Sequence, residues 1–384
     1  MHYLYIGYYV DESTFSEILE KGINNMSVAR QKLEYNLIRG LYEDLKQDIS
    51  FISYVPTDGR ITIPDFSKID EAIIKHINIK KNSVSSVKES YSSFKRYLLG
   101  LGKNKLRNLC VLMYAVIPPF EQVLLNLRKR YGFKIVTICS EVPKLRRYSN
   151  SIPSKLKKAL LTFYNEQFDG YVFLSEAMKE VVNIKSKPYI VMEGIACDRG
   201  IQIQADRKNI VMYAGGLAKD NNIPLLIKCC LKLEPLHEIW VCGTGSDRDT
   251  IIELAKKDSR VKYFGMIPND DVLKMEEQAK VLVNFRNPNA ELTKYSFPSK
   301  ILEYIESGCV VVSTRLEGIP SEYFDYIIPI ENIDETNIIN TLDRVMQMED
   351  AEYCSICKKA KDFINTEKDY LQQSKRIIAF LENL

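Results

Sequence analysis

Residues 291–314 read ELTKYSFPSKILEYIESGCVVVST. Pro298 suits a first helical turn, because the N–H that proline lacks has no partner there. Apolar side chains then recur at helical spacing: Ile301, Leu302 and Ile305. Gly308 stands where the end of a helix favours a positive φ, and residues 309–312 are an apolar run typical of parallel sheets. The stretch therefore predicts a loop, a helix and a buried strand.

Two side chains of this helix do not suit a plain core helix. Lys300 and Glu303 are three residues apart and share a face. They lie near the helix start, where free N–H groups and the helix dipole attract anions. One reading places a diphosphate there, with the lysine beside it and the carboxylate on ribose hydroxyls. The other reading is a surface ion pair worth a few tenths of a kcal/mol, and the helix alone favours this second reading.

Length and composition predict a soluble globular protein of two domains. The 384 residues exceed what one hydrophobic core holds, and the apolar and charged contents are ordinary. No apolar run reaches the ~20 residues of a membrane span. The start of the chain, MHYLYIGYYVDES, lacks the basic region of a signal peptide and reads as a first strand. We therefore expect a cytoplasmic protein.

The cysteines and histidines argue against a metal site. The chain has nine cysteines, an odd number, and most of them fall in apolar strand or helix patterns. This placement is typical of reduced thiols in a cytoplasm. Cys354 and Cys357 form a lone CxxC, and only three histidines are present, so we expect no metal.

Positive charge is concentrated in residues 80–158. This segment has 18 Lys and Arg but only three acidic residues. Such a segment is typical of proteins with an anionic partner: a nucleic acid, a membrane surface or a phosphorylated substrate. The plain alternative is a solvated basic face. Basic residues near an anionic leaflet contribute about 1 kcal/mol each, so this segment can bring the protein to the inner face of a membrane.

Strand and helix patterns alternate along the chain, which predicts α/β domains with doubly wound parallel sheets. Residues 196–209 are polar and non-periodic and mark a linker. We expect a first Rossmann-like domain over residues 1–196, a second over 197–368, and a last helix at 369–384 that packs back on the first. Ligands of such sheets bind beyond the carboxyl ends of the strands. We expect the two domains to face each other across a cleft.

Glycine turns follow three predicted strands of the second half: Gly215-Gly216, Gly243-Thr244-Gly245 and Gly265. Glycines allow backbone N–H groups to approach a ligand closely. Lys219 lies just past the first turn, although alone it reads as a surface lysine. Arg286 and Lys294 bracket the loop before the helix described above, and two cations near one helix start are typical of an anion site.

Five segments occur in an order that resembles a known family: MYAGGL (212–217), WVCGTGSD (240–247), VKYFGMIPNDDVL (261–273), VNFRNPNAELTKYSFPSKILEYIESGCVVVST (283–314) and EGIPSEYFDY (317–326). Together they resemble the donor half of retaining GT-B glycosyltransferases of the family-4 type. They are most similar to bacterial members that build capsular and exopolysaccharide repeat units. The resemblance is strong over residues 209–330 and covers the first half in outline only.

The resemblance implies two Rossmann-like domains and transfer of a hexosyl group from a nucleotide-sugar, usually a UDP-sugar, without a metal or other cofactor. It implies that the second domain binds the donor and the first domain binds the acceptor. Glu303 would bind the ribose hydroxyls, and the helix start (Ser299, Lys300 and Ile301) with Lys219 would bind the diphosphate. The backbone of Met266 and Ile267 would edge the base.

The chain departs from the family pattern in two places. Many members carry two glutamates eight residues apart, but Tyr295 stands eight residues before Glu303. Gly216 occupies the place of a common arginine. We expect Arg286 and Lys294 to substitute, so we group Gly215, Gly216, Gly243, Gly245, Tyr295 and Ser296 with them at the donor site, and Lys294 also serves catalysis.

We expect the leaving diphosphate to be neutralised by cations as the glycosidic bond breaks, with no enzyme nucleophile. Glu141 is our acceptor-side candidate, and a helix-capping role is an equal alternative. A lipid-linked glycan at the inner membrane face fits the basic first half. An alternative function is that of a non-catalytic GT-B subunit that binds a glycan or a partner transferase. We expect no nucleic-acid partner, because no recognition motif is present.

Overall fold

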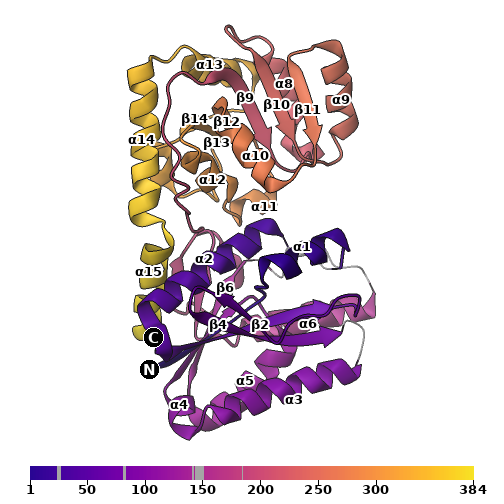
Figure 1. The fold of residues 1–384 in the computed structure, drawn as a ribbon, viewed down its shortest axis with the longest axis vertical. Coiled ribbons are helices and arrows are strands. Elements are labelled where there is room, and N and C mark those ends of the chain that lie inside the picture. Colours follow the sequence, from indigo (N-terminus) through magenta and orange to yellow (C-terminus); the bar gives the residue numbers. More distant parts are fainter. Residues whose placement is uncertain (24–26, 81–83, 141, 143–150, 184) are drawn as a thin grey trace. The chain divides into compact units, whose positions relative to one another are not determined.

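The computed structural model describes residues 1–23, 27–80, 84–140, 142, 151–183 and 185–384. These residues form two compact units (Figure 1). The first domain comprises residues 1–195 and 370–384, and the second comprises residues 196–369. Helix α15 (Tyr370–Glu382) thus belongs to the first domain, although it follows the second in the chain. What each domain binds stays a prediction.

The first domain is built on an eight-stranded sheet in the order β3-β4-β2-β1-β5-β6-β7-β8. All neighbouring strands are parallel except β3 and β4, which are antiparallel. The strands are β1 (His2–Gly7), β2 (Ile49–Thr57), β3 (Phe66–Ile69), β4 (Ala72–Lys80), β5 (Leu109–Tyr114), β6 (Lys134–Cys139), β7 (Gly170–Phe173) and β8 (Tyr189–Val191).

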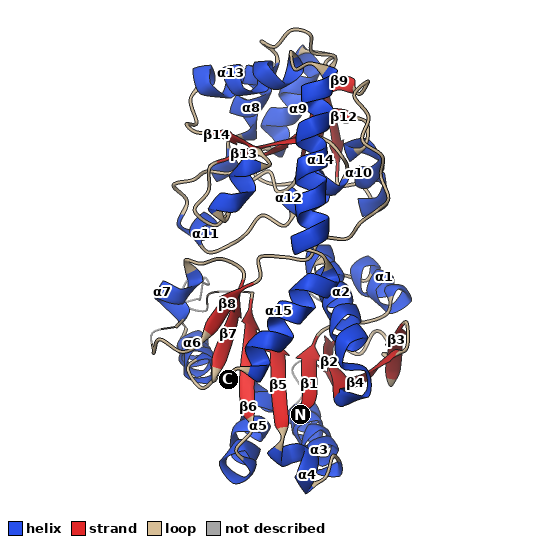
Figure 2. Cartoon of the chain, turned by 90° about the vertical axis from the view of Figure 1, so that its left-hand side faces the viewer, coloured by secondary structure: helices blue, strands red, loops and turns tan. Residues whose placement is uncertain are grey.

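Helices cover both faces of this sheet (Figures 1 and 2). On one face, α2 and α15 pack against each other and against β1, β2 and β5 in one apolar core. On the other face lie α3 and α5. The helices that precede the second domain are α1 (Glu12–Glu20), α2 (Val28–Leu45), α3 (Val84–Gly100), α4 (Lys103–Arg107), α5 (Pro118–Tyr131), α6 (Ile152–Asn165) and α7 (Met178–Val182).

The second domain has a six-stranded parallel sheet in the order β11-β10-β9-β12-β13-β14. Its strands are β9 (Lys208–Ala214), β10 (Glu238–Cys242), β11 (Val261–Gly265), β12 (Ala279–Asn284), β13 (Val310–Thr314) and β14 (Ile328–Ile330). Its helices are α8 (Ile223–Cys230), α9 (Arg248–Lys257), α10 (Asn269–Glu276), α11 (Glu291–Lys294), α12 (Lys300–Glu306), α13 (Glu335–Met346) and α14 (Asp350–Glu367).

Alternation along β9 shows why this sheet is buried on both sides. Val211 and Tyr213 belong to the core that α8, α9 and α13 close. Met212 and Ala214 point the other way, into the core that α10, α12 and α14 close. Because successive side chains of a strand point to opposite faces, a strand covered by helices on both faces must be apolar throughout.

Helix α1 forms in a largely polar stretch of the first domain. Asp11 caps the helix, because its side chain accepts a hydrogen bond from the Thr14 N–H at 2.9 Å. Phe15 and Ile18 are buried at helical spacing. The polar residues around them masked a short amphipathic helix whose capping residue was visible in the sequence.

Each sheet has one point where the strand order reverses. In the first domain the reversal lies between β1 and β5, and in the second it lies between β9 and β12. Helices that connect the strands on either side of such a point leave a crevice at the carboxyl ends, where ligands of these folds bind.

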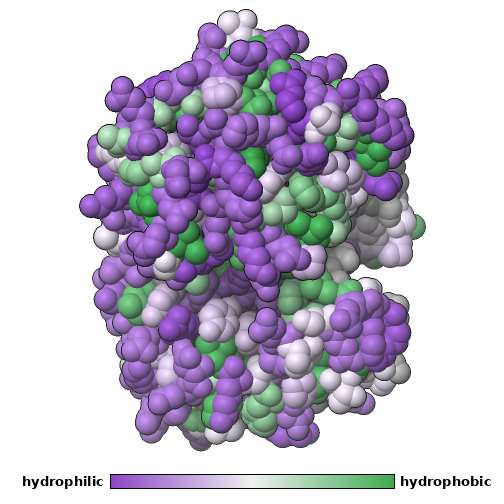
Figure 3. Space-filling model, turned by 45° about the horizontal axis from the view of Figure 1, so that its top comes forward, coloured by the Kyte–Doolittle hydropathy of each residue, from purple (hydrophilic) through white to green (hydrophobic). Residues whose placement is uncertain are grey.

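The drawn face of the molecule is largely hydrophilic, with small separate hydrophobic areas (Figure 3). Within the described ranges, no helix has the length and apolar character needed to cross a membrane.

Candidate functional site

Three glycine turns interlock at the carboxyl edge of the second sheet. The Gly215 N–H donates to Cys242 O at 3.1 Å, and the Gly243 N–H donates to Gly265 O at 2.7 Å. Gly243 has a φ of 129°, and a Cβ there would lie 1.9 Å from Gly215 O. Only glycine permits this backbone approach.

Side chains below the first turn hold it in place. The Tyr213 hydroxyl donates to Gly216 O at 2.8 Å, and the Asn221 amide donates to the same oxygen at 3.1 Å. The Lys219 N–H donates to Ser246 Oγ at 2.8 Å, which ties the first turn to the second. The Lys219 side chain itself is exposed.

Arg286 follows β12 at the point where the strand order reverses. Its backbone is fixed by Thr314, whose hydroxyl donates to Arg286 O at 2.8 Å. Burial lowers the pKa of Arg286, and the groups that oppose this shift are the phenols of Tyr213 and Tyr304. Among the described residues, no carboxylate pairs with the guanidinium. A partly buried cation therefore lies beside the glycine turns, and no described residue supplies its counter-ion.

Lys300, by contrast, has two carboxylate partners. Its ammonium binds Glu276 Oε1 at 3.1 Å and also Glu303 Oε1. Burial lowers the pKa of Lys300, but the charges of Glu276 and Glu303 outweigh this effect and raise it. Burial raises the pKa of Glu276 to about 8, and Lys300 opposes that shift. The predicted surface pair is thus part of a half-buried triad.

Tyr304 fastens this triad to the end of β9. Its hydroxyl accepts from the Ala214 N–H at 3.0 Å and donates to Ala214 O at 3.1 Å. The Lys300 ammonium lies 5.8 Å from the centre of the Tyr304 ring. The helix that carries Glu303 is therefore tied to the strand from which the first glycine turn starts.

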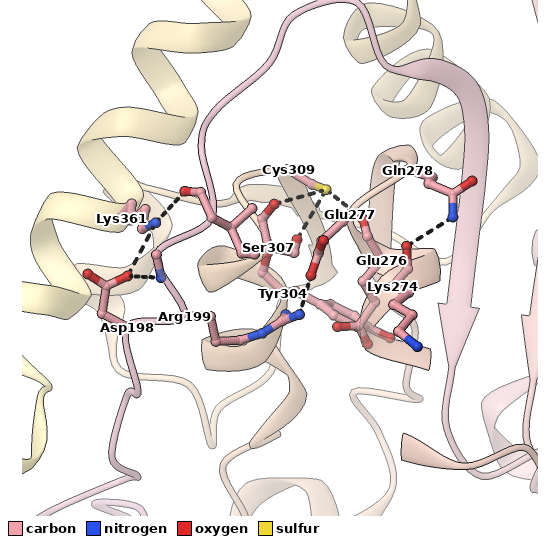
Figure 4. Close-up of polar contacts among 12 residues, drawn as sticks. Asp198, Arg199, Lys274, Glu276, Glu277, Gln278, Tyr304, Ser307, Cys309 and Lys361 are labelled. Atoms are coloured by element: carbon pink, nitrogen blue, oxygen red, sulfur yellow. Dashed lines mark hydrogen bonds and ion pairs between the residues drawn. The ribbon is translucent and has the colours of Figure 1, made fainter. Parts of the chain in front are cut away.

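The polar segment 196–209 belongs to the second domain and packs beside Glu276 of this triad (Figure 4). Arg199 pairs with Glu277, which adjoins Glu276. Lys361 binds Asp198 at 3.3 Å, and Cys309 donates to Glu276 O at 2.9 Å. These contacts hold the end of α10, and with it Glu276, in a fixed place.

Lys294 and its neighbours form a separate group. Lys294 pairs with Glu317 at 3.2 Å, with both side chains well exposed. Tyr295 is half-buried, and the Ser296 hydroxyl donates to Leu292 O at 3.3 Å. The loop packs tightly against Gly318, where a Cβ would lie 2.4 Å from Thr293 O.

The remaining predicted residues lie on α12 and at the end of β11. Ser299 is exposed, whereas the Ile301 side chain is buried and its N–H donates to Pro298 O at 2.9 Å. Because α12 has only seven residues, its start is a weak anion site by itself. Met266 is exposed just past β11, and Ile267 packs on the core.

Glu141 lies outside the described residues. Across the described ranges, no cluster of His, Cys, Asp and Glu side chains could hold a metal ion.

Sequence reasoning missed Glu276, Tyr213 and Tyr304. The first is 24 residues from Lys300 and the other two are core positions, so no local pattern marks them.

Comparisons with known proteins give a family match for the second domain and solved structures of the same fold. Residues 208–347 match the family described as "Glycosyl transferases group 1". No curated protein sequence matches the chain.

Solved structures with the same fold include an E. coli trehalose-6-phosphate protein bound with UDP-2-fluoro glucose, at 12% identity, 100% and 99% coverage and a TM-score of 0.64. Anabaena Alr3699/HepE in complex with UDP and glucose is 12% identical, with full coverage of both chains and a TM-score of 0.63. The lipopolysaccharide outer core galactosyltransferase WaaB is 14% identical, with 100% and 99% coverage and a TM-score of 0.64.

The chain therefore has the GT-B fold class of two Rossmann-like domains. Residues 208–347 of its second domain are similar to that glycosyltransferase family, and the enzyme class that this match supports is glycosyltransferase.

Proposed function

We propose that the chain transfers a sugar from a UDP-sugar to a glycan acceptor and that the second domain binds the donor. The observation that carries this proposal is Arg286, a partly buried guanidinium without a carboxylate partner among the described residues. Burying a charge without a partner is unfavourable, so a ligand with negative charge would stabilise it. The adjoining glycine turns offer backbone N–H groups, which suits a diphosphate.

The remaining groups fit the rest of a nucleotide-sugar. Glu303, held by Lys300, is our candidate for the ribose hydroxyls, and Met266 and Ile267 for the edge of the base. Lys219, Tyr295, Ser296 and Ser299 are candidates for the phosphates and the sugar. Two of the similar structures are described as containing UDP or a UDP-sugar analogue, which supports uracil as the base.

We propose transfer with retention, in which the acceptor hydroxyl attacks from the face that the leaving diphosphate occupies. Arg286 would stabilise the charge that develops on the diphosphate, and Lys294 would assist if it left Glu317. The acceptor we propose is a lipid-linked glycan of surface polysaccharide biosynthesis, reached at the inner face of the membrane.

Calorimetric titration with UDP, GDP and ADP in EDTA tests the donor site. We expect one nucleotide to bind, and Arg286→Met to weaken that binding by about 100-fold because a charged hydrogen bond is lost. Arg344→Met is the matched control, since Arg344 is an exposed arginine of the same domain. If the unaltered protein binds no nucleotide, the proposal fails and a non-catalytic subunit is favoured.

A further inference from the structure

Helix α6 presents a row of large apolar side chains to solvent. Ile152, Leu156, Leu160 and Phe163 are 74%, 66%, 43% and 53% exposed. They are spaced by four, four and three residues, so they share one face of the helix. Soluble proteins rarely expose such a continuous apolar row without a partner for it.

The opposite face of α6 is anchored in the first domain. Leu161 and Tyr164 are buried. The Tyr164 hydroxyl donates to Gln122 Oε1 at 2.9 Å, and Asn165 O accepts from the Tyr171 hydroxyl at 2.7 Å. Because these contacts hold one face of the helix on the domain, the apolar row on the other face points to solvent.

Lysines flank the apolar row on both sides. At 100° per residue, Lys155 precedes the row around the helix and Lys157 follows it. Both side chains are exposed. Neither lysine forms an ion pair with another described residue. An apolar face between two basic borders is the pattern of a helix that lies in the plane of an anionic membrane surface.

We propose that α6 docks the protein on an anionic lipid bilayer, with its four apolar side chains in the acyl boundary and Lys155 and Lys157 at the headgroups. This inference deepens the proposed function and rests on it, because a lipid-linked acceptor is reached only at a membrane. Within the basic segment 80–158, this proposal assigns membrane contact to one helix. Binding then depends on insertion of apolar side chains as well as on attraction between opposite charges. An apolar face alone would fit a second copy of the chain equally well, but the lysine borders favour anionic lipid.

Flotation of the full chain with vesicles tests the proposal. We expect binding to phosphatidylcholine vesicles that contain phosphatidylglycerol, and much weaker binding to phosphatidylcholine alone. Leu156→Gln with Phe163→Gln should lower binding by about 100-fold, as each buried apolar side chain contributes about tenfold. Lys155→Gln with Lys157→Gln should lower it by about 25-fold, and only on anionic vesicles. Phe66→Gln is the matched control, because Phe66 is an apolar residue of β3 that is 54% exposed.

Sedimentation of the same variants tests the alternative that a second copy of the chain covers α6. If the unaltered chain is a dimer that the α6 substitutions convert to a monomer, and vesicles do not bind it, α6 is an interface between copies and the proposal is wrong. Unchanged flotation of the Leu156 and Phe163 variant would also overturn it. UDP titration of that variant should be unaffected, so a failure of the donor proposal is seen separately.

Discussion

The two sheets reverse their strand order at equivalent points, but the side chains there carry opposite character. Beside β9 and β12, the second domain has glycine turns and Arg286, which no carboxylate pairs among the described residues. Beside β1 and β5, the first domain has two buried carboxyls, Glu34 and Glu121.

The two carboxyls of the first domain accept hydrogen bonds, but burial disfavours their ionised forms. Glu34 Oε2 accepts from the Tyr8 N–H at 2.7 Å and from the Tyr5 hydroxyl at 3.0 Å. Glu121 Oε1 accepts from the Ile117 N–H at 2.7 Å. Burial raises the pKa of Glu34 to about 7 and that of Glu121 to about 8. A cation thus lies beside one crevice and buried carboxyls lie beside the other, which teaches that topology sets the place of a site and side chains set its chemical character.

The largest expected effect compares a glycine from each crevice. Gly243→Ala would drive a Cβ into backbone at 1.9 Å in a left-handed conformation, and we expect about 4 kcal/mol of destabilisation. Gly7→Ala would place a Cβ 2.0 Å from the Glu34 carboxylate, which is a side-chain and not a backbone contact, so we expect roughly half of that loss. Thermal unfolding followed by calorimetry would measure both, and equal losses would contradict the distinction between backbone and side-chain packing.

The second effect concerns Glu121 and pH. The pKa of its carboxyl is about 8 in the folded protein, above the usual 4.5, so folding disfavours the ionised form. The free energy of unfolding should therefore fall as pH rises from about 4.5 to about 8, and level off above that.

Glu121→Gln keeps the acceptor for Ile117 and removes the ionisation. We expect the variant to be more stable than the unaltered protein at pH 9, by on the order of a few kcal/mol, and similar to it at pH 5. Glu180→Gln, at an exposed position, should change neither value. A variant with the same pH slope as the unaltered protein would show that Glu121 does not titrate in this range.

A smaller effect separates the roles of the two cations in the second domain. Because both carboxylates hold the Lys300 ammonium, we expect Lys300 to position Glu303 rather than to bind phosphate. Lys300→Met should then weaken the binding of uridine and of UDP by the same factor, about tenfold. Arg286→Met should weaken the binding of UDP alone. Competition titrations with both ligands measure this, and a loss confined to UDP in the Lys300 variant would assign the diphosphate to Lys300.

The smallest effect is on the stability of the empty protein. Arg286 is partly desolvated without a counter-ion among the described residues, so Arg286→Met should leave the free energy of unfolding unchanged or raise it by up to about 1 kcal/mol. In the first domain, Tyr5→Phe removes the hydroxyl that donates to the Glu34 carboxyl. This variant should lower the free energy of unfolding by about 1 kcal/mol. Thermal unfolding without nucleotide compares the two, and a large loss in the Arg286 variant would mean that the guanidinium is structural.

Much of the second domain could be predicted from local pattern. The strands and helices of residues 210–314 follow apolar periodicity, and the glycine turns end β9, β10 and β11 as expected. The first domain was harder, because polar residues obscured α1 and the antiparallel pair of β3 and β4 falls in a segment whose pattern was mixed.

The sequence by itself determined the alternation of strands and helices, the place of the glycine turns and the residues that bear charge, because each depends on neighbours a few positions away. Tertiary structure alone decided which charges are paired. Lys300 meets Glu276 across 24 residues, while Arg286 meets no carboxylate among the described residues. Pairing depends on which chain segments the sheet brings together, and the desolvation that gives a charge its chemical use exists only once they are packed.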